Sequence, residues 1–265
     1  MKKTCLFAML VVCLDFVLAN FAGAGQILDE VLKKGELVVG VSGDQLPFNA
    51  TTKEGEIVGL DADIARGIAR NMNVKIRFSR MQFSDLLPAL QSGKVDMIVS
   101  GMTMTPERNM KVAFVGPYYV SSKGILIKLK NVEKLKKEGL NSALFNVAAL
   151  KTSTSQEILE KAAPKAKLML VGSYDDALSL LYQDKVEAVI ADFPFCAYIA
   201  DRYPEKQLAV GETKLSFEPL GIAVREDALW INSLDNFLKM LVGSGDMTAL
   251  QERWFKSRTW LTLLP

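Results

Sequence analysis

The chain has 265 residues, of which 49% are hydrophobic and 23% charged, a composition typical of a globular protein with a packed core. The formal net charge of +2 comes from 32 basic and 30 acidic residues without a basic cluster, which argues against nucleic-acid binding. The chain has no histidine and so lacks the commonest general base and the commonest metal ligand. We therefore expect no metal and no cofactor.

The first 24 residues have the pattern of a secretion signal. Two lysines at positions 2 and 3 precede an apolar stretch over 6–18, and the small residues 22–24 form a cleavage site. We expect the segment 1–24 to be removed and the mature chain to be periplasmic. The alternatives are an uncleaved membrane anchor and lipid attachment at Cys13.

Strands and helices are expected to alternate after this segment. Asp61 is the expected N-cap of the first helix, in which apolar residues recur every four positions. The expected elements are a strand over 36–42, a helix after residue 61, a strand over 74–78, a helix over 84–92 and a buried strand over 95–100. This order predicts an α/β architecture with parallel sheets.

An internal similarity links two parts of the chain. Phe83–Gly101 reads FSDLLPALQSGKVDMIVSG, and Tyr174–Asp192 reads YDDALSLLYQDKVEAVIAD. Each copy predicts a helix, a tight turn and a buried strand. The match is either a coincidence between two common αβ units or the sign of two similar lobes. In the second case the strand ends, 100–101 and 191–192, belong at a ligand cleft, because ligands of open α/β sheets bind beyond the carboxyl ends of strands.

Two strand-like stretches, 121–130 and 211–217, are expected to cross between the lobes. The predicted division is a signal over 1–24, a first lobe over 25–120 that is completed by 214–265, and a second lobe over 121–213. Leucine and isoleucine residues between 229 and 241 have helical spacing in the returning segment.

Three polar features are candidate binding groups. Thr105 has the pattern of a helix N-cap and places Arg108 in the first turn, where its guanidinium can bind a carboxylate; the alternative is a solvated surface arginine. Thr154 with Glu157 fits a capping box, so 153–155 mark a helix start that either binds an anion or only caps. Asp192 ends an apolar strand and either binds a cation or caps the next helix.

The chain shows no catalytic motif. It has no Ser-His-Asp set, no Cys-His pair, no glycine-rich dinucleotide fingerprint after a strand and no Walker motif. We therefore expect a protein that is not an enzyme, although carboxylates are plentiful.

Two runs carry a family resemblance. DADIARGIARNMNVKIRF and PALQSGKVDMIVSGMTMTPERNMKVAFVGPYY resemble the polar amino-acid-binding branch of the periplasmic solute-binding proteins, and the resemblance extends from about residue 28 to 255. It implies a type II fold of two α/β lobes with two crossover strands and a ligand cleft between them. It also implies a monomer that binds a polar amino acid, delivers it to the permease of an ABC transporter, and binds no nucleic acid.

The resemblance also implies roles for individual residues. Arg108 would bind the ligand carboxylate and Asp192 the α-ammonium group, while Phe83 would pack on the ligand side chain. The other residues implied around the ligand head group are Ser100, Gly101, Thr103, Ser153, Thr154 and Ser155.

The first strand departs from the family pattern. Ser42 stands where many members have an acid, and Gln45 stands where they have an aromatic residue. These two departures put a basic ligand in doubt, unless Asp44 compensates. With Phe48, which is either a core aromatic or a wall of the site, they complete the expected ligand-binding set.

Two other functions remain open. Cyclohexadienyl and arogenate dehydratases resemble the same fold, but Phe195 stands where they need an acid. A sensory binding protein that reports to a membrane receptor is the third possibility.

Overall fold

The computed structural model describes residues 25–264, apart from the side chains of residues 212–215, so the predicted signal segment lies outside the described part. The helices are α2 (Gln26–Lys34), α3 (Leu60–Asn71), α4 (Phe83–Gln91), α5 (Pro106–Asn109), α6 (Val132–Glu138), α7 (Thr154–Ala162), α8 (Tyr174–Tyr182), α9 (Phe193–Arg202), α10 (Ala228–Gly243) and α11 (Asp246–Gln251). The strands are β1 (Glu36–Val41), β2 (Asp44–Gln45), β3 (Asn49–Thr51), β4 (Ile57–Val58), β5 (Lys75–Arg80), β6 (Met97–Ile98), β7 (Ala113–Lys128), β8 (Asn146–Leu150), β9 (Lys167–Val171), β10 (Ala188–Asp192) and β11 (Leu208–Val224).

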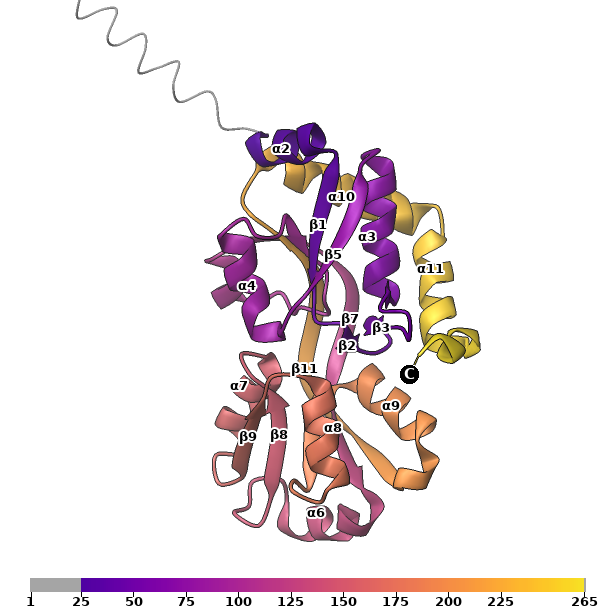
Figure 1. The fold of residues 1–265 in the computed structure, drawn as a ribbon. Helices are drawn as coiled ribbons and strands as arrows, with labels where there is room; N and C mark the ends of the chain where they lie inside the picture. Colours follow the sequence, from indigo (N-terminus) through magenta and orange to yellow (C-terminus); the bar gives the residue numbers. More distant parts are fainter. Residues whose placement is uncertain (1–24, 265) are drawn as a thin grey trace, which may run out of the picture.

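The main sheet runs through two lobes. Its strand order is β5-β1-β6-β11-β7-β10-β8-β9, and β2, β3 and β4 form a separate small sheet. In the first lobe β1 pairs in parallel with β5 and β6. In the second lobe β8 pairs in parallel with β9 and β10. Helices α3, α4, α10 and α11 surround the first lobe, and α6 to α9 surround the second (Figure 1).

Two long antiparallel strands join the lobes. β7 and β11 pair with each other along both lobes, and their register shifts between Thr213 and Glu218. They include most of the predicted crossover stretches and extend beyond them in the first lobe. The prediction of a two-lobed type II α/β fold with two crossover strands is confirmed, while the exact lobe boundaries stay a prediction.

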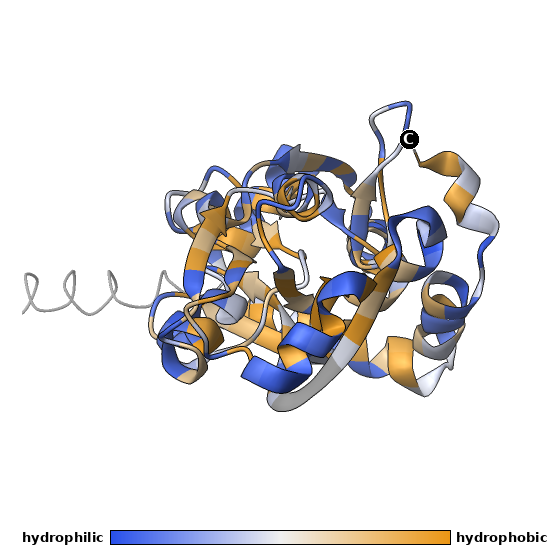
Figure 2. Cartoon of the chain, turned by 90° about the horizontal axis from the view of Figure 1, so that it is seen from below, coloured by the Kyte–Doolittle hydropathy of each residue, from blue (hydrophilic) through white to orange (hydrophobic). Residues whose placement is uncertain are grey.

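Burial follows the alternation of elements. All residues of β10 are buried, and β10 lies inside the sheet, parallel to β8 and antiparallel to β7. One hydrophobic cluster spans both lobes, and a smaller one lies beneath β8 in the second lobe. Figure 2 shows hydrophobic residues along the interior strands, whereas the helices also carry hydrophilic residues.

The start of α3 corrects the predicted cap. Gly59, not Asp61, holds the cap position, with a φ of 127°. A Cβ at this glycine would lie 2.1 Å from the carbonyl oxygen of Phe48, so a side chain does not fit there. Asp61 is instead fully buried inside the helix, where it accepts hydrogen bonds from Asn49 Nδ2 and Tyr118 Oη, both at 2.8 Å.

The expected strand over 95–100 is buried throughout, but only Met97–Ile98 pairs as β6. The Asp96 side chain accepts hydrogen bonds from Val38 N and Lys34 Nζ, both at 2.8 Å. Asp96 N also donates to the Val38 carbonyl oxygen at 2.8 Å, so both the backbone and the side chain of Asp96 hold the start of the segment against β1.

No helix within residues 25–264 is long and apolar enough to span a membrane. The same residues contain no cluster of three or more acidic or cysteine side chains that could hold a metal ion.

Candidate functional site

A cavity lies between the two lobes, beside the crossover strands. Residues from the first lobe, from β7 and from the second lobe all contribute to its wall. The lining residues are Gln45, Phe83, Gly101, Thr103, Arg108, Lys123, Leu150, Ser153, Thr154, Tyr174 and Asp192.

The internal similarity places four of these residues. Phe83 and Tyr174 begin α4 and α8, while Gly101 follows β6 and Asp192 ends β10. Both copies form the predicted helix, turn and strand, and all four ends meet at the cavity. Tyr174 was absent from the predicted site, although its alignment with Phe83 was the signal that could have identified it.

Arg108 is held by both lobes. Thr105 caps α5 and accepts a hydrogen bond from Arg108 N at 3.2 Å, as predicted. Arg108 is 6% exposed, which excludes a solvated surface arginine. Its guanidinium donates to the carbonyl oxygens of Thr103 at 2.8 Å and of Thr152, in the second lobe, at 3.0 Å. It also lies 5.6 Å from the centre of the Phe83 ring. Burial lowers the pKa of Arg108 from its usual value.

The start of α7 differs from the prediction by one residue. Ser153, not Thr154, is the N-cap, and its Oγ accepts a hydrogen bond from Gln156 N at 3.3 Å. Thr154 is therefore the first helical residue, and its hydroxyl is free to donate to Glu218 at 2.8 Å. The first backbone N–H groups of a helix have no partner within it, so they suit an anion at this wall.

Asp192 is the centre of contacts that cross between the lobes. One carboxylate oxygen lies 3.1 Å from Lys123 Nζ on β7. The other accepts a hydrogen bond at 2.8 Å from Gln45 Nε2 in the first lobe. Asp192 is 2% exposed, and it makes no side-chain cap to α9. Its position favours cation binding over helix capping.

Glu218 on β11 completes a second set of contacts between the lobes. Its Oε2 accepts hydrogen bonds from Thr103 at 2.7 Å and from Thr154 at 2.8 Å, and it lies 3.6 Å from Lys123 Nζ. Burial raises the pKa of Glu218, but Lys123 and the hydroxyl donors outweigh it and hold the pKa below its usual value. Glu218 is therefore ionised at neutral pH.

Lys123 and Glu218 were not predicted as site residues. Lys123 lies in the expected crossover 121–130, and Glu218 comes one position after the crossover 211–217. A charged side chain in a strand-like stretch was the available signal, but exposed strand edges carry such residues as well.

Three predicted residues lie behind the cavity wall. Ser42 N donates to Ser100 Oγ at 2.9 Å, and Ser42 Oγ donates to Asn49 at 3.0 Å. The first bond joins the ends of β1 and β6, and the second joins the end of β1 to β3. Ser155 Oγ is buried and has no hydrogen-bond partner within the described residues.

Phe48 requires a correction. Its ring is fully buried, and it packs edge-on against Tyr119 and Phe255 at centroid distances of 5.2 and 5.5 Å. It belongs to the core and not to the cavity wall, so we remove it from the candidate set.

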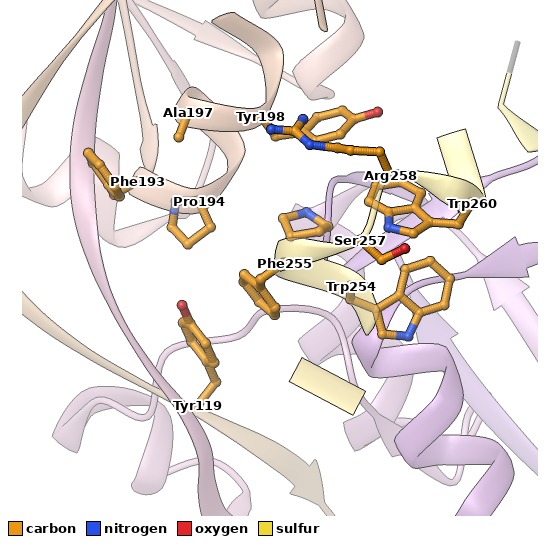
Figure 3. A pocket seen from close by; sticks show the side chains of 11 residues that line it. Tyr119, Phe193, Pro194, Ala197, Tyr198, Trp254, Phe255, Ser257, Arg258 and Trp260 are labelled. Carbon is orange, nitrogen blue, oxygen red and sulfur yellow. The ribbon is translucent and has the colours of Figure 1, made fainter. Parts of the chain in front are cut away.

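A second, aromatic pocket separates α9 from the C-terminal segment 252–264, which we call the C-terminal clasp (Figure 3). Trp260 of the clasp stacks on Tyr198 of α9 at 5.3 Å. Arg258 forms an ion pair with Asp201. The clasp thus connects the first lobe to the second outside the cavity.

Comparisons with known proteins agree with this architecture. The family model of bacterial extracellular solute-binding proteins, family 3, matches residues 37–257. The chain is 29% identical to the ABC transporter arginine-binding protein 1 of Escherichia coli, over 82% of this chain and 89% of that protein. It is 30% identical to the ABC transporter glutamine-binding protein GlnH of Bacillus subtilis, over 83% of this chain and 81% of that protein.

Among solved structures, the ancestral amino acid-binding protein AncCDT-1, described as a precursor of cyclohexadienyl dehydratase, is similar to this chain. Its TM-score is 0.79 and its sequence identity 36%, with 86% of this chain and 99% of that chain covered. Both the matched length and the fold support one assignment: the chain belongs to the bacterial extracellular solute-binding proteins of family 3.

Proposed function

We propose that this protein is an extracytoplasmic receptor that captures an α-amino acid by lobe closure and delivers it to the permease of an ABC transporter. One observation carries the proposal: Arg108 of the first lobe and Asp192 of the second line the same buried cavity. Relatives named as arginine-binding and glutamine-binding proteins of ABC transporters support it.

The two charges suit the two ends of an amino acid. Arg108 binds the α-carboxylate through its planar donor fork, helped by the N-terminus of α7. Asp192 binds the α-ammonium group. A buried ligand charge without a partner is costly, so both ends are satisfied only when the lobes are closed. The ligand therefore favours the closed form.

A thermal-shift panel of the twenty amino acids tests the proposal. A ligand present at a hundred times its dissociation constant stabilises the folded protein by about 2.7 kcal/mol, which is readily detected. We expect at least one amino acid to raise the melting temperature and to bind in calorimetric titration. If none of the twenty does so at millimolar concentration, the protein is not an amino-acid receptor.

Export and delivery are the finer part of the proposal. We propose that the segment 1–24 is a cleaved signal and that the mature protein is periplasmic. N-terminal sequencing of the native protein is expected to begin near Gly25; intact Met1 on membrane-bound protein contradicts this. Loss of ligand uptake after gene deletion distinguishes transport from a sensory role.

We also propose that the protein is not a dehydratase. Phe195 is 1% exposed, stacks on Tyr174 at 4.3 Å and supplies no acid to the cavity. Glu218 is near the cavity, but its lowered pKa makes it a poor proton donor. We expect no turnover of prephenate or arogenate. Turnover that survives purification and disappears on substitution of a cavity residue contradicts this.

A further inference from the structure

Two opposite charges lie where the crossover strands pass the cavity. Lys123 comes from β7 and Glu218 from β11, and each is 3% exposed. Lys123 Nζ lies 3.6 Å from Glu218 Oε2 and 3.1 Å from Asp192 Oδ1. This buried cation therefore contacts the acid that is proposed to bind the ligand ammonium group.

We propose that the Lys123–Glu218 pair sets the charge balance of the cavity, so that it accepts an α-amino acid whose side chain carries no net charge. This inference rests on the proposed function and names the ligand class for the same site.

The balance follows from the charged groups at the cavity. Arg108, Lys123 and Asp192 line the cavity, and Glu218 contacts Lys123 from outside the lining at 3.6 Å. Arg108 and Lys123 are positive, and Asp192 and Glu218 are negative, so these four groups sum to zero. A zwitterion adds one charge of each sign and leaves the sum unchanged. An extra charge on the ligand side chain would be buried in the closed form without a counter-charge, which costs binding free energy.

Two other acids lie near the cavity, but neither lines it. One oxygen of Asp44, Oδ2, accepts a hydrogen bond from Tyr174 N at 2.7 Å, and the other is buried without a hydrogen-bond partner among the described residues. Asp61 lies behind the wall and accepts from Asn49 and Tyr118. Neither carboxylate reaches into the cavity to meet a cationic ligand side chain.

The contacts of Glu218 make the pair part of the closed form. A single carboxylate oxygen, Oε2, accepts hydrogen bonds from Thr103 of the first lobe and from Thr154 of the second. Lys123 is held in the same way between Asp192 and Glu218. Neutralising either Lys123 or Glu218 should therefore change which ligand charge the cavity prefers, while the cavity walls stay in place.

The test compares three ligands of similar size, glutamine, glutamate and ornithine, by calorimetric titration at concentrations up to tens of millimolar. For the wild type we expect glutamine to bind at least about tenfold more tightly than either charged ligand. Lys123→Met removes a buried cation and should shift the ornithine-to-glutamine affinity ratio about tenfold toward ornithine. Glu218→Gln should shift the glutamate-to-glutamine ratio by a similar factor toward glutamate.

Two further variants make the test specific. The double variant Lys123→Met with Glu218→Gln restores the balance, so its ratios should return toward those of the wild type. Lys128 lies on the same strand as Lys123 but pairs with Asp184, away from the cavity. Lys128→Met should therefore leave the affinity ratios unchanged. Circular dichroism verifies folding, and Lys123→Gln replaces Lys123→Met if the latter does not fold.

The outcomes separate this inference from the proposed function. If amino acids bind but the wild type prefers a charged ligand over glutamine, or neither single variant moves its ratio by threefold, the charge-balance inference is wrong and the receptor function stands. If the wild type binds none of the three ligands and none of the twenty amino acids, both are wrong.

Discussion

Arg108 is the residue whose substitution tests the proposed ligand contacts most directly. Replacing Arg108 with alanine leaves the ligand carboxylate buried without its charged partner. We expect a loss of about 2–5 kcal/mol in binding free energy, and an intermediate loss for Arg108→Lys, because an ammonium group cannot form the planar fork. Calorimetric titration of the best ligand measures both. Affinity within threefold of wild type for Arg108→Ala would place the carboxylate elsewhere.

Asp61 should make stability depend on pH. Burial raises its pKa to about 6, against the opposing effect of the hydrogen bonds from Asn49 and Tyr118. Between about pH 4 and 6 the native state binds more protons than the unfolded state, so stability falls as the pH rises through this range. The contribution is at most about 3 kcal/mol.

Asp61→Asn removes this titration, so its free energy of unfolding should fall less between pH 4 and 6 than that of the wild type. Urea unfolding at several pH values measures the two curves. Asp29→Asn, at an exposed acid in α2, is the control and should follow the wild-type curve. Parallel curves for Asp61→Asn and the wild type would show that Asp61 titrates normally.

The C-terminal clasp should influence ligand affinity from outside the cavity. Tyr198 of α9 stacks on Trp260 at 5.3 Å, and such a pair contributes about 0.5–1.5 kcal/mol. If the contact favours the closed form, Tyr198→Ala should weaken ligand binding about 2- to 10-fold without touching the site. Tyr182→Ala is the matched control, since Tyr182 contacts Tyr203 within the second lobe. Equal affinities for the two variants would exclude a role for the clasp in closure.

The elements also show what the sequence can and cannot predict. Apolar periodicity and the internal similarity predicted the alternating strands and helices. They also placed Phe83, Gly101 and Asp192 at strand and helix ends, and all three line one cavity. Cap positions were predicted less well. Glycine is required at position 59 because the carbonyl of Phe48 lies against it, and the spacing of residues around position 59 does not reveal that contact. Lys123 and Glu218 are 95 residues apart in the sequence (123 and 218), and local spacing carries no information about a contact between residues so far apart.

Three hydrogen bonds between the lobes define a closed form of the molecule. Gln45 with Asp192, Arg108 with the Thr152 carbonyl, and Asp44 with Tyr174 N all cross from one lobe to the other. β7 and β11 are the strands that continue through both lobes, so bending there opens the cavity while each lobe keeps its own parallel strands. A hinge of this kind absorbs motion in a few residues of the connecting segments.

Ligand binding should therefore make the molecule more compact in solution. Without ligand, opening hydrates the buried charges of Arg108 and Asp192; with ligand, both are paired and the closed form gains population. We expect the radius of gyration from small-angle X-ray scattering to decrease when saturating ligand is added. The double variant Arg108→Ala with Asp192→Ala should show no decrease at the same ligand concentration, whereas Lys128→Met should behave as the wild type. An unchanged radius in wild-type protein that calorimetry shows to be saturated would mean that capture does not require closure.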